Sequence, residues 1–376
     1  MDFELDEDQQ LLVDSVARWL ESGYRFEDFR RFSADVTVAP QRWAKMAELG
    51  LLSVNIPSGD GGLGGGSIEA LLVMQLFGRA LVVDPYVSNA IIATALFNRD
   101  SPGAGRQQVL RQIGEGFLRM AIAVLEPDGR FDLNHVGSTA TVTSDGYSLS
   151  GRKAVVIHGD SADRFIVSAR TAGSTDDAHG ISLFLVDART AGISIRGFPT
   201  IDGQRAAEID FAEVRVERGA LMGQLHNGAG PLEWAVDRGI AALCAEAVGA
   251  MEKLLELTTE HLRTRKQFGQ PIGKFQVLQH RVADMAIALE QARSMAFLAA
   301  AKIDVLDRVE RRRAISAAKA MIGRSGRFVG QQAVQLHGGM GMTDDIPVGH
   351  YFKRLTAIDM TWGNVEHHVE LYGDLM

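Results

Sequence analysis

The spacing of apolar residues divides this chain of 376 residues into three zones. Up to about residue 117, apolar positions recur every three or four residues, which predicts helices that each bury one face. The first helix is expected to start after the N-cap residue Asp6 and to bury Leu12, Val16, Trp19 and Leu20. Further helices are expected over 43–49, where Gly50 would form a left-handed C-cap, after Ser67, and over 88–97.

From about residue 118 to 225 apolar and polar positions alternate, which predicts strands, with a hairpin turn at Asp145–Gly146. From about 228 the helical spacing returns in long segments with Ala-rich apolar stripes, typical of an antiparallel bundle. The clearest strands are 181–186, 193–196 and 207–216, and the long helices are 232–263, 275–305 and 311–336. We therefore expect an α+β fold with a helical domain at 1–117, a β-barrel-like middle domain at 118–227 and a helical bundle at 228–376.

Composition removes several classes of function. The net charge of −8 argues against nucleic-acid binding, which needs a basic surface, and the cluster 311–313 of three arginines is expected to be a solvated helix face. The single cysteine, Cys244, excludes an internal disulfide and is expected to be a buried, unreactive thiol. No Cys/His set has metal-ligand spacing, and no apolar run is long enough to span a membrane. The acidic N-terminus is unlike a signal peptide, so a cytoplasmic protein without a metal site is expected.

Three glycine-containing motifs stand out. The cluster GDGGLGGG at 59–66 lacks the Lys-Ser/Thr pair of a phosphate loop, so we interpret it as a tight connection between two helices. The segment RTRKQFGQPIG at 263–273 places Arg265 beside Phe268, which suits a ligand with a phosphate and a planar base, or is simply a helix-end charge beside a core ring. The segment QLHGGMGM at 335–342 either brings backbone close to a ligand or is a simple helix C-cap.

In combination, these motifs and the order of the three zones resemble the acyl-CoA dehydrogenase family over essentially the whole chain. Other matching segments are 3–10, LEPDG at 125–129 and FQVLQHRVADM at 275–285. The segments HGDSADRFIVSAR, RKQFG, GRSGRFVGQQAVQLHGG and VGHYFKRL are most similar to the small subunits of two-component, pimeloyl-CoA-type dehydrogenases. The resemblance implies the acyl-CoA dehydrogenase fold, with a C-terminal four-helix bundle, and FAD as cofactor, with the electron-transfer flavoprotein as the usual electron acceptor.

The resemblance also implies how FAD would be held. In the family, FAD lies at a subunit interface, where one β-domain binds the flavin ring and the neighbouring bundle binds the ADP half. Arg265 matches the pyrophosphate-binding arginine, Phe268 the ring near the cofactor, and Gln276 a further glutamine that contacts it. The remaining cofactor-binding candidates are Gln267 in the same turn and Gln335, Gly338 and Gly339 at the adenine end. The half-site that this chain would lend to a neighbour is therefore complete.

The chemistry of the family needs a carboxylate base that removes the α-proton of the acyl thioester while hydride leaves to the flavin. Trp362 stands where the usual Glu is expected, and tryptophan cannot accept that proton. Some members carry the base on the first bundle helix, and that position here is Asp237, followed by a CoA-binding arginine, Arg238. Asp237 is therefore the candidate catalytic base, or else it forms an ion pair on a helix surface. Trp234 and Arg238 match substrate-binding positions.

The middle domain departs from the family pattern too. Residues that bond the flavin ring in the family are replaced here by apolar side chains, namely Leu125, Phe131, Val155 and Ile157. A flavin ring bound here would keep unpaired polar edges, each of which costs roughly 1–3 kcal/mol. The flavin face of this chain is therefore expected to be degraded.

Two principal hypotheses follow. In the first, this chain is an accessory subunit whose bundle completes the FAD site of a second acyl-CoA dehydrogenase subunit in an α2β2 heterotetramer. In the second, it is an autonomous dehydrogenase, a homo-oligomer with Asp237 as base. An oxygen-using acyl-CoA oxidase is the third alternative. The small-subunit resemblance favours dicarboxylic, branched or ring-bearing acyl groups, as in fatty acid or steroid side-chain degradation.

Overall fold

The computed structural model describes residues 5–34, 39–100 and 104–376; Phe3 and Glu4 of the opening motif lie outside these ranges. Asp6 caps the first helix as predicted, because its Oδ1 accepts a 2.8 Å hydrogen bond from the Gln9 backbone N–H. The described N-terminal helices are α1 (Glu7–Gly23), α2 (Phe26–Ala34), α3 (Ala39–Glu48), η2 (Leu51–Ser53), η3 (Ser58–Asp60), α4 (Ser67–Ala80), η4 (Val87–Ala93), α5 (Thr94–Asp100) and α6 (Ala104–Gly114). Gly50 follows α3 with a φ of 73°, which confirms the predicted left-handed helix end.

The middle zone forms one mixed sheet. Its described strands are β1 (Met120–Ala123), β2 (Thr139–Val142), β3 (Gly146–Ile157), β4 (Arg164–Arg170), β5 (Ile181–Asp187), β6 (Ile193–Pro199), β7 (Arg205–Glu217) and β8 (Leu221–Met222). They follow the order β6-β7-β3-β2-β4-β5-β8, and β1 pairs with β4 in parallel. The predicted hairpin at Asp145–Gly146 joins β2 to β3. A separate apolar core, which includes Phe165, Phe184 and Ile209, fills this domain.

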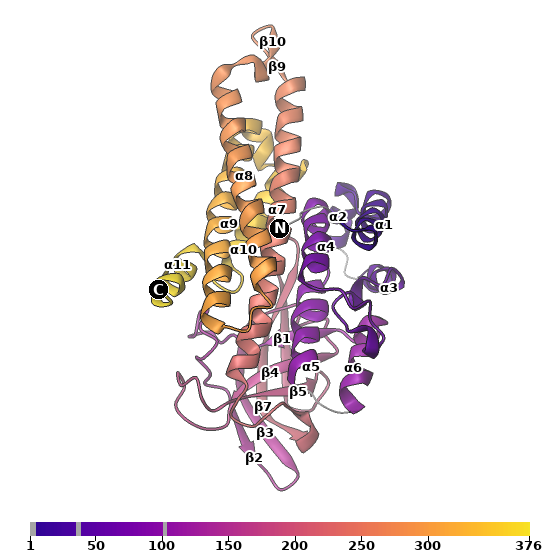
Figure 1. Ribbon diagram of the computed structural model, residues 1–376, viewed down its shortest axis with the longest axis vertical. Helices are drawn as coiled ribbons and strands as arrows, with labels where there is room; N and C mark the ends of the chain where they lie inside the picture. Colours follow the sequence, from indigo (N-terminus) through magenta and orange to yellow (C-terminus); the bar gives the residue numbers. More distant parts are fainter. Residues whose placement is uncertain (1–4, 35–38, 101–103) are drawn as a thin grey trace.

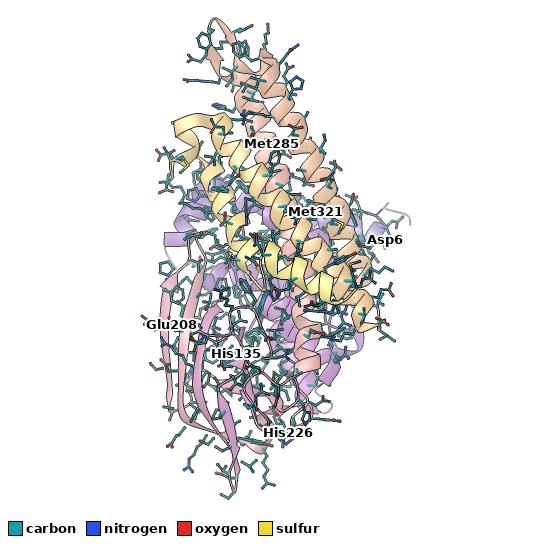
Figure 2. The ribbon with its side chains drawn as sticks, turned by 90° about the vertical axis from the view of Figure 1, so that its left-hand side faces the viewer. Asp6, His135, Glu208, His226, Met285 and Met321 are labelled. Carbon is teal, nitrogen blue, oxygen red and sulfur yellow. The ribbon has the colours of Figure 1, made fainter. Side chains whose placement is uncertain are left out.

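The C-terminal zone is a bundle of long helices. Its described elements are α7 (Ala229–Thr264), β9 (Lys266–Gln267), β10 (Gln270–Pro271), η6 (Ile272–Lys274), α8 (Gln276–Lys302), α9 (Arg308–His337), η7 (Gly338–Met342), α10 (Pro347–Met360) and α11 (Val365–Asp374). Helices α7 and α8 extend away from the sheet, and the β9–β10 hairpin connects them at the far tip of the molecule (Figure 1). In the side view, the bundle residues Met285 and Met321 lie above the β-domain residues Glu208 and His135 (Figure 2).

Helix α4 of the N-terminal domain packs directly on α7. A Cβ on Gly78 would lie 1.9 Å from the Glu246 carbonyl, and one on Gly249 would lie 1.8 Å from the Gln75 carbonyl, so only glycine allows this approach. The resulting core joins the two helical zones. The α+β architecture predicted from the sequence is confirmed.

Neither a membrane-spanning helix nor a metal site was expected from the sequence. No described helix is both long and apolar enough to cross a membrane, and no three described His, Cys, Asp or Glu side chains are grouped as metal ligands would be. Cys244 is a fully buried free thiol, which confirms the expected burial, and burial raises the pKa of this thiol to about 12.

Candidate functional site

The predicted cofactor residues of the first long helix lie at the exposed tip of the bundle. Arg265 is the C-cap of α7 and is exposed, and Gln267 lies in β9, which pairs with β10. Phe268, in the turn between these strands, is 90% exposed and has a left-handed φ of 53°. The alternative of a helix-end charge beside a core ring is therefore wrong, because Phe268 is outside every core. A large apolar ring held in solvent on a strained turn indicates a surface that contacts something else.

The ends of α7 and α9 meet through two histidines. The rings of His261 and His337 are stacked with centroids 4.3 Å apart. Burial and the neighbouring His337 and Arg265 lower the pKa of His261, so these rings favour the neutral form. The contact places Arg265 at the same end of the bundle as the turn that follows α9.

That turn contains the other cofactor candidates. Gly338 is the C-cap of α9 with a φ of 64°. A Cβ on Gly338 or Gly339 would have open space around it to a distance of 4 Å, so the backbone is open to an approaching group. Gln335, on the last turn of α9, and Gln276, at the start of α8, are exposed. The predicted set thus lies at one end of the bundle, on its surface.

Asp237 is buried inside the bundle. It is 0% exposed and accepts hydrogen bonds from Arg311 Nε at 3.0 Å and from Arg312 Nη1 at 2.6 Å. Burial raises the pKa of Asp237 above its ordinary value, although the two guanidinium groups act to lower it. The expectation that the 311–313 cluster is a solvated helix face is therefore wrong for Arg311 and Arg312, because the sequence did not show that a carboxylate on α7 faces them.

Trp362 lies in the tight loop between α10 and α11. The φ of Trp362 is 58°. Lys319 stabilises the loop, because its buried Nζ donates hydrogen bonds to the carbonyls of Asp359 at 2.8 Å and Gly363 at 2.6 Å. His368 Nε2 donates to the Trp362 carbonyl at 3.0 Å. Burial lowers the pKa of Lys319 to about 8. These bonds fix the loop at the position where the resemblance leads us to expect the usual Glu.

A cavity of about 440 Å³ adjoins Trp362, and we name it the second cavity. Leu125, Val155 and Ile157 line it, so three of the positions that would bond a flavin ring face one space. Val155 sits at an irregularity between β3 and β7 with a φ of 51°, which turns its side chain outward to 52% exposure. Phe131, the fourth position, packs instead against the ring of His367 at 5.4 Å.

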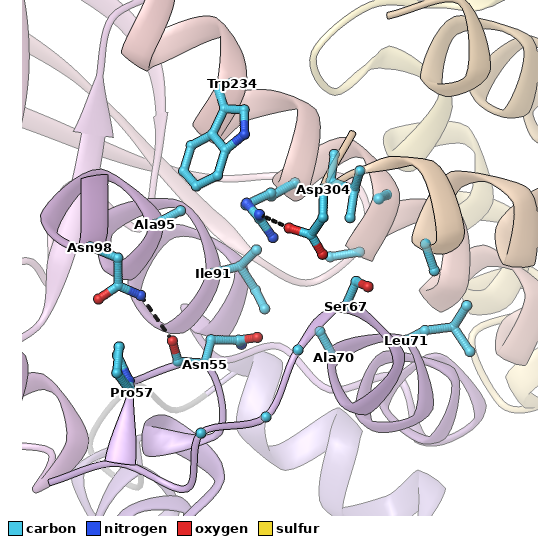
Figure 3. Close-up of a pocket in the computed structure, with 18 residues that line it drawn as sticks. Asn55, Pro57, Ser67, Ala70, Leu71, Ile91, Ala95, Asn98, Trp234 and Asp304 are labelled. Carbon is cyan, nitrogen blue, oxygen red and sulfur yellow. Dashed lines mark hydrogen bonds and ion pairs between the residues drawn. The ribbon is translucent and has the colours of Figure 1, made fainter. Parts of the chain in front are cut away.

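The first cavity, of about 350 Å³, lies between α4, α5, α7 and the end of α8 (Figure 3). Trp234 and Arg238 line it, with the Arg238 guanidinium 4.1 Å from the centroid of the indole and paired with Asp304. Arg99 lies over the same indole at 4.8 Å. The glycine cluster at 59–66 connects two helices, as predicted. Its last three glycines, 64–66, line this cavity.

The predicted substrate residues and the predicted flavin face belong to separate spaces. The two cavities share no lining residue, and Asp237 lines neither. Three residues of these sites were not predicted from the sequence. Asp304 lines the first cavity, His158 lines the second, and Lys319 bonds the loop that carries Trp362. A basic or polar residue inside an otherwise apolar helical stripe, such as Lys319, was the one available signal.

The residues present fit FAD on one side only. The exposed tip offers a guanidinium, a ring and open glycine backbone, which suit a pyrophosphate and an adenine. At the positions expected to contact a flavin ring, the second cavity has Leu125, Val155 and Ile157, whose side chains cannot bond its polar edges. The exposed tip therefore suits the ADP half of FAD, whereas the three cavity positions expected to contact its ring are apolar.

Comparisons with known proteins agree with this architecture. Family models described as the N-terminal, middle and C-terminal domains of acyl-CoA dehydrogenase match residues 6–116, 121–218 and 226–374. Acryloyl-CoA reductase (NADH) of Anaerotignum propionicum is 28% identical over 375 residues, which cover 98% of this chain and 94% of that protein.

Two solved structures of paired proteins are also similar. The Tcur3481-Tcur3483 steroid ACAD variant has a TM-score of 0.87 at 28% identity and covers 98% of this chain and 97% of its own. The ChsE4-ChsE5 complex from Mycobacterium tuberculosis has a TM-score of 0.88 at 25% identity, with 100% and 98% covered.

Proposed function

Because the chain belongs to the acyl-CoA dehydrogenase family, FAD-dependent oxidoreductases that act on acyl-CoA, we propose that it is the accessory subunit of a two-chain dehydrogenase. The observation that carries this proposal is an asymmetry within the chain. The Arg265–Phe268 turn and the Gln335–Gly339 turn, which carry the residues that we propose for FAD, lie at one end of the bundle. The second cavity, where the chain's own flavin ring would lie, is lined by apolar replacements.

The exposed tip would complete the FAD site of the partner. The Arg265 guanidinium can pair with the pyrophosphate, and Phe268 can cover the cofactor, with Gln267 and Gln276 beside them. Gln335 and the open backbone of Gly338 and Gly339 would receive the adenine end. When bound, FAD accepts the hydride that leaves the acyl-CoA. In this chain these residues bind and orient the cofactor, while the base belongs to the partner.

The chain's own acid–base group is missing. Trp362 occupies the usual position of the base, on a loop fixed by Lys319. Asp237 is bound on both oxygens by Arg311 and Arg312, and such a carboxylate serves as a structural ion pair. Its raised pKa is the one observation that favours the autonomous dehydrogenase or an oxidase, with Asp237 as base.

We propose an α2β2 heterotetramer, because two of the similar solved structures, Tcur3481-Tcur3483 and ChsE4-ChsE5, are of paired proteins. The Tcur3481-Tcur3483 pair is a steroid ACAD, which supports ring-bearing acyl-CoA as the substrate class. Trp234 and Arg238, at the first cavity, are the residues that we propose for contact with the acyl-CoA. An electron-transfer flavoprotein would take the electrons, and the cytoplasm is the proposed location.

The test compares the chain alone with the chain co-expressed with its candidate partner, a related dehydrogenase that carries the usual Glu and flavin-bonding residues. Flavin content is read by absorbance, and flavin reduction by an acyl-CoA is followed anaerobically. We expect the chain alone to lack FAD and the complex to hold about one FAD per heterodimer. A yellow homo-oligomer whose flavin is reduced by acyl-CoA, and which loses this reaction in Asp237→Asn, would establish the autonomous enzyme instead.

A further inference from the structure

Two polar side chains that line the second cavity, His158 and Gln204, make no hydrogen bond to the described part of the protein. His158 lines this cavity and is 8% exposed. Its Nε2 is sealed from solvent without a hydrogen-bond partner, whereas Nδ1 is accessible and bonds no residue in the described part of the chain, so Nδ1 is the nitrogen that a ligand in the cavity can reach. An unpaired polar group inside an apolar wall lowers stability, so it marks a place where a ligand can supply a hydrogen bond.

The carboxylate of Asp84, which lines the same cavity, already has hydrogen-bond partners within the protein. Asp84 accepts hydrogen bonds from the Tyr24 hydroxyl at 2.7 Å and from Arg42 Nε and Nη2 at 3.0 and 2.9 Å. Both of its oxygens therefore already accept hydrogen bonds from groups of the protein.

The other charged groups form a closed network around Arg354. This guanidinium donates to Glu246 Oε1 and Oε2 at 2.5 and 2.7 Å and to Asp202 Oδ2 at 2.6 Å, and Thr200 donates to Asp202 Oδ1 at 2.5 Å. Together with Asp84 and its partner Arg42, the charged groups comprise three carboxylates and two guanidinium groups, which is an excess of one negative charge. An anion would be repelled by this excess, and a cation would find no unoccupied carboxylate oxygen. The cavity selects an uncharged ligand.

Most of the remaining wall and the mouth are apolar, and the four lining hydroxyls, of Ser88, Thr200, Thr356 and Thr361, already donate hydrogen bonds within the protein. Val155, Ile201 and Met360 line the cavity while remaining 52%, 66% and 52% exposed, so the mouth presents apolar side chains to solvent. The interior includes Phe77 and Leu243. The volume of about 440 Å³ lies within the range of pockets that bury a small molecule.

We propose that the second cavity binds a neutral, largely apolar ring compound that carries a carbonyl or hydroxyl group, held by a hydrogen bond to His158. The inference rests on the proposed accessory function, because it assigns to this space a ligand other than a flavin ring. The replacements that remove hydrogen bonds to a flavin, Leu125, Val155 and Ile157, make the same walls suit such a compound. Burial lowers the pKa of His158 to about 4, so the imidazole that meets the ligand is neutral.

The test uses estrone as a neutral four-ring probe and estrone sulfate as its anionic counterpart. Equilibrium dialysis with radiolabelled probe is carried out on the full chain, alone and in its complex. We expect saturable binding of one estrone per chain and at least tenfold weaker binding of estrone sulfate. His158→Phe, which keeps a ring and removes the hydrogen bond, is expected to weaken estrone binding about 3- to 10-fold.

Two exposed positions give a matched pair that leaves the core intact. Ile201→Trp narrows the mouth and is expected to abolish binding, whereas Val142→Trp, on a strand residue that is 69% exposed and lines neither cavity, is expected to leave it unchanged. Absence of saturable estrone binding, or binding that neither His158→Phe nor Ile201→Trp alters, overturns the proposal. The FAD content of the complex is measured in parallel, so an intact one-FAD heterodimer without estrone binding rejects only this inference and leaves the accessory function standing.

Discussion

The Asp237 carboxylate on α7 lies 2.6 Å from Arg312 Nη1 on α9, inside the bundle. This contact joins two long helices that are 75 residues apart in sequence at that point. It also explains why an arginine cluster follows the start of α9, since Arg311 bonds the other carboxylate oxygen. The pair is part of the packing of the bundle.

From this geometry we expect Asp237→Asn to lower the free energy of unfolding by about 3 kcal/mol, because it leaves Arg311 and Arg312 with Glu233, 3.7 Å away, as their remaining counter-ion. Urea denaturation of the isolated chain measures this. Asp304→Asn is the matched control, because Asp304 is 60% exposed and its pair with Arg238 is expected to contribute about 0–1 kcal/mol. An Asp237→Asn protein of unchanged stability that loses only turnover would point to a catalytic carboxylate.

The exposed bundle tip gives a second prediction. Arg265→Ala and Phe268→Ala are expected to change the free energy of unfolding by no more than about 0.5 kcal/mol, because both side chains are exposed. In the complex, Arg265→Ala is expected to weaken FAD binding about 10- to 100-fold, the value of one charge-assisted contact to pyrophosphate. Arg263→Ala, also exposed at the end of α7, serves as control. Equal loss of FAD in the control variant would contradict a specific role for Arg265.

Local signals in the sequence predicted the fold well. Asp6 and Gly50 bound helices, Asp145–Gly146 forms the hairpin, and the change from a three-to-four spacing to alternation marks the sheet. These signals depend on neighbours within a few residues, so they can be seen without packing. The π-helix η4 is an exception, since its apolar run resembles an ordinary buried helix.

The site was harder to predict because it depends on which face of a helix meets which neighbour. Asp237 and Arg238 are adjacent in sequence, yet consecutive side chains on a helix point about 100° apart. Asp237 therefore meets α9, while Arg238 meets the first cavity. The sequence pattern places the two in one site, and only the packing of α8 and α9 around α7 separates them.

Restoring the missing base alone is not expected to restore activity. In Trp362→Glu the chain still lines its second cavity with Leu125, Val155 and Ile157, which leave the edges of a flavin ring unpaired. We expect this variant, expressed alone, to show no flavin absorbance and no reaction with acyl-CoA. We also expect a loss of about 2 kcal/mol in unfolding free energy, because a partly buried indole is removed. Flavin reduction by acyl-CoA in the single variant would mean that the ring site is intact after all.

The buried imidazoles predict a particular loss of stability in acid. Burial lowers the pKa of His158 to about 4 and that of His368 to about 3, against about 6.5 in an unfolded chain. Between these values the unfolded chain binds more protons, so stability is fully present above pH 6.5 and falls as the pH drops toward 4. From pH 6.5 to 5 each imidazole is expected to cost about 2 kcal/mol of unfolding free energy.

Urea denaturation at pH 5, 6 and 7 tests this, in a range where carboxylates remain largely ionised. His158→Phe is expected to reduce the loss between pH 7 and 5 by about 2 kcal/mol, because the group that takes up the proton on unfolding is gone. His280→Gln, at an exposed position on α8, is expected to leave the pH dependence unchanged. A His158→Phe chain with the full acid sensitivity of the natural sequence would show that this imidazole is already protonated or solvated in the fold, which would also remove the neutral hydrogen-bonding group from the second cavity.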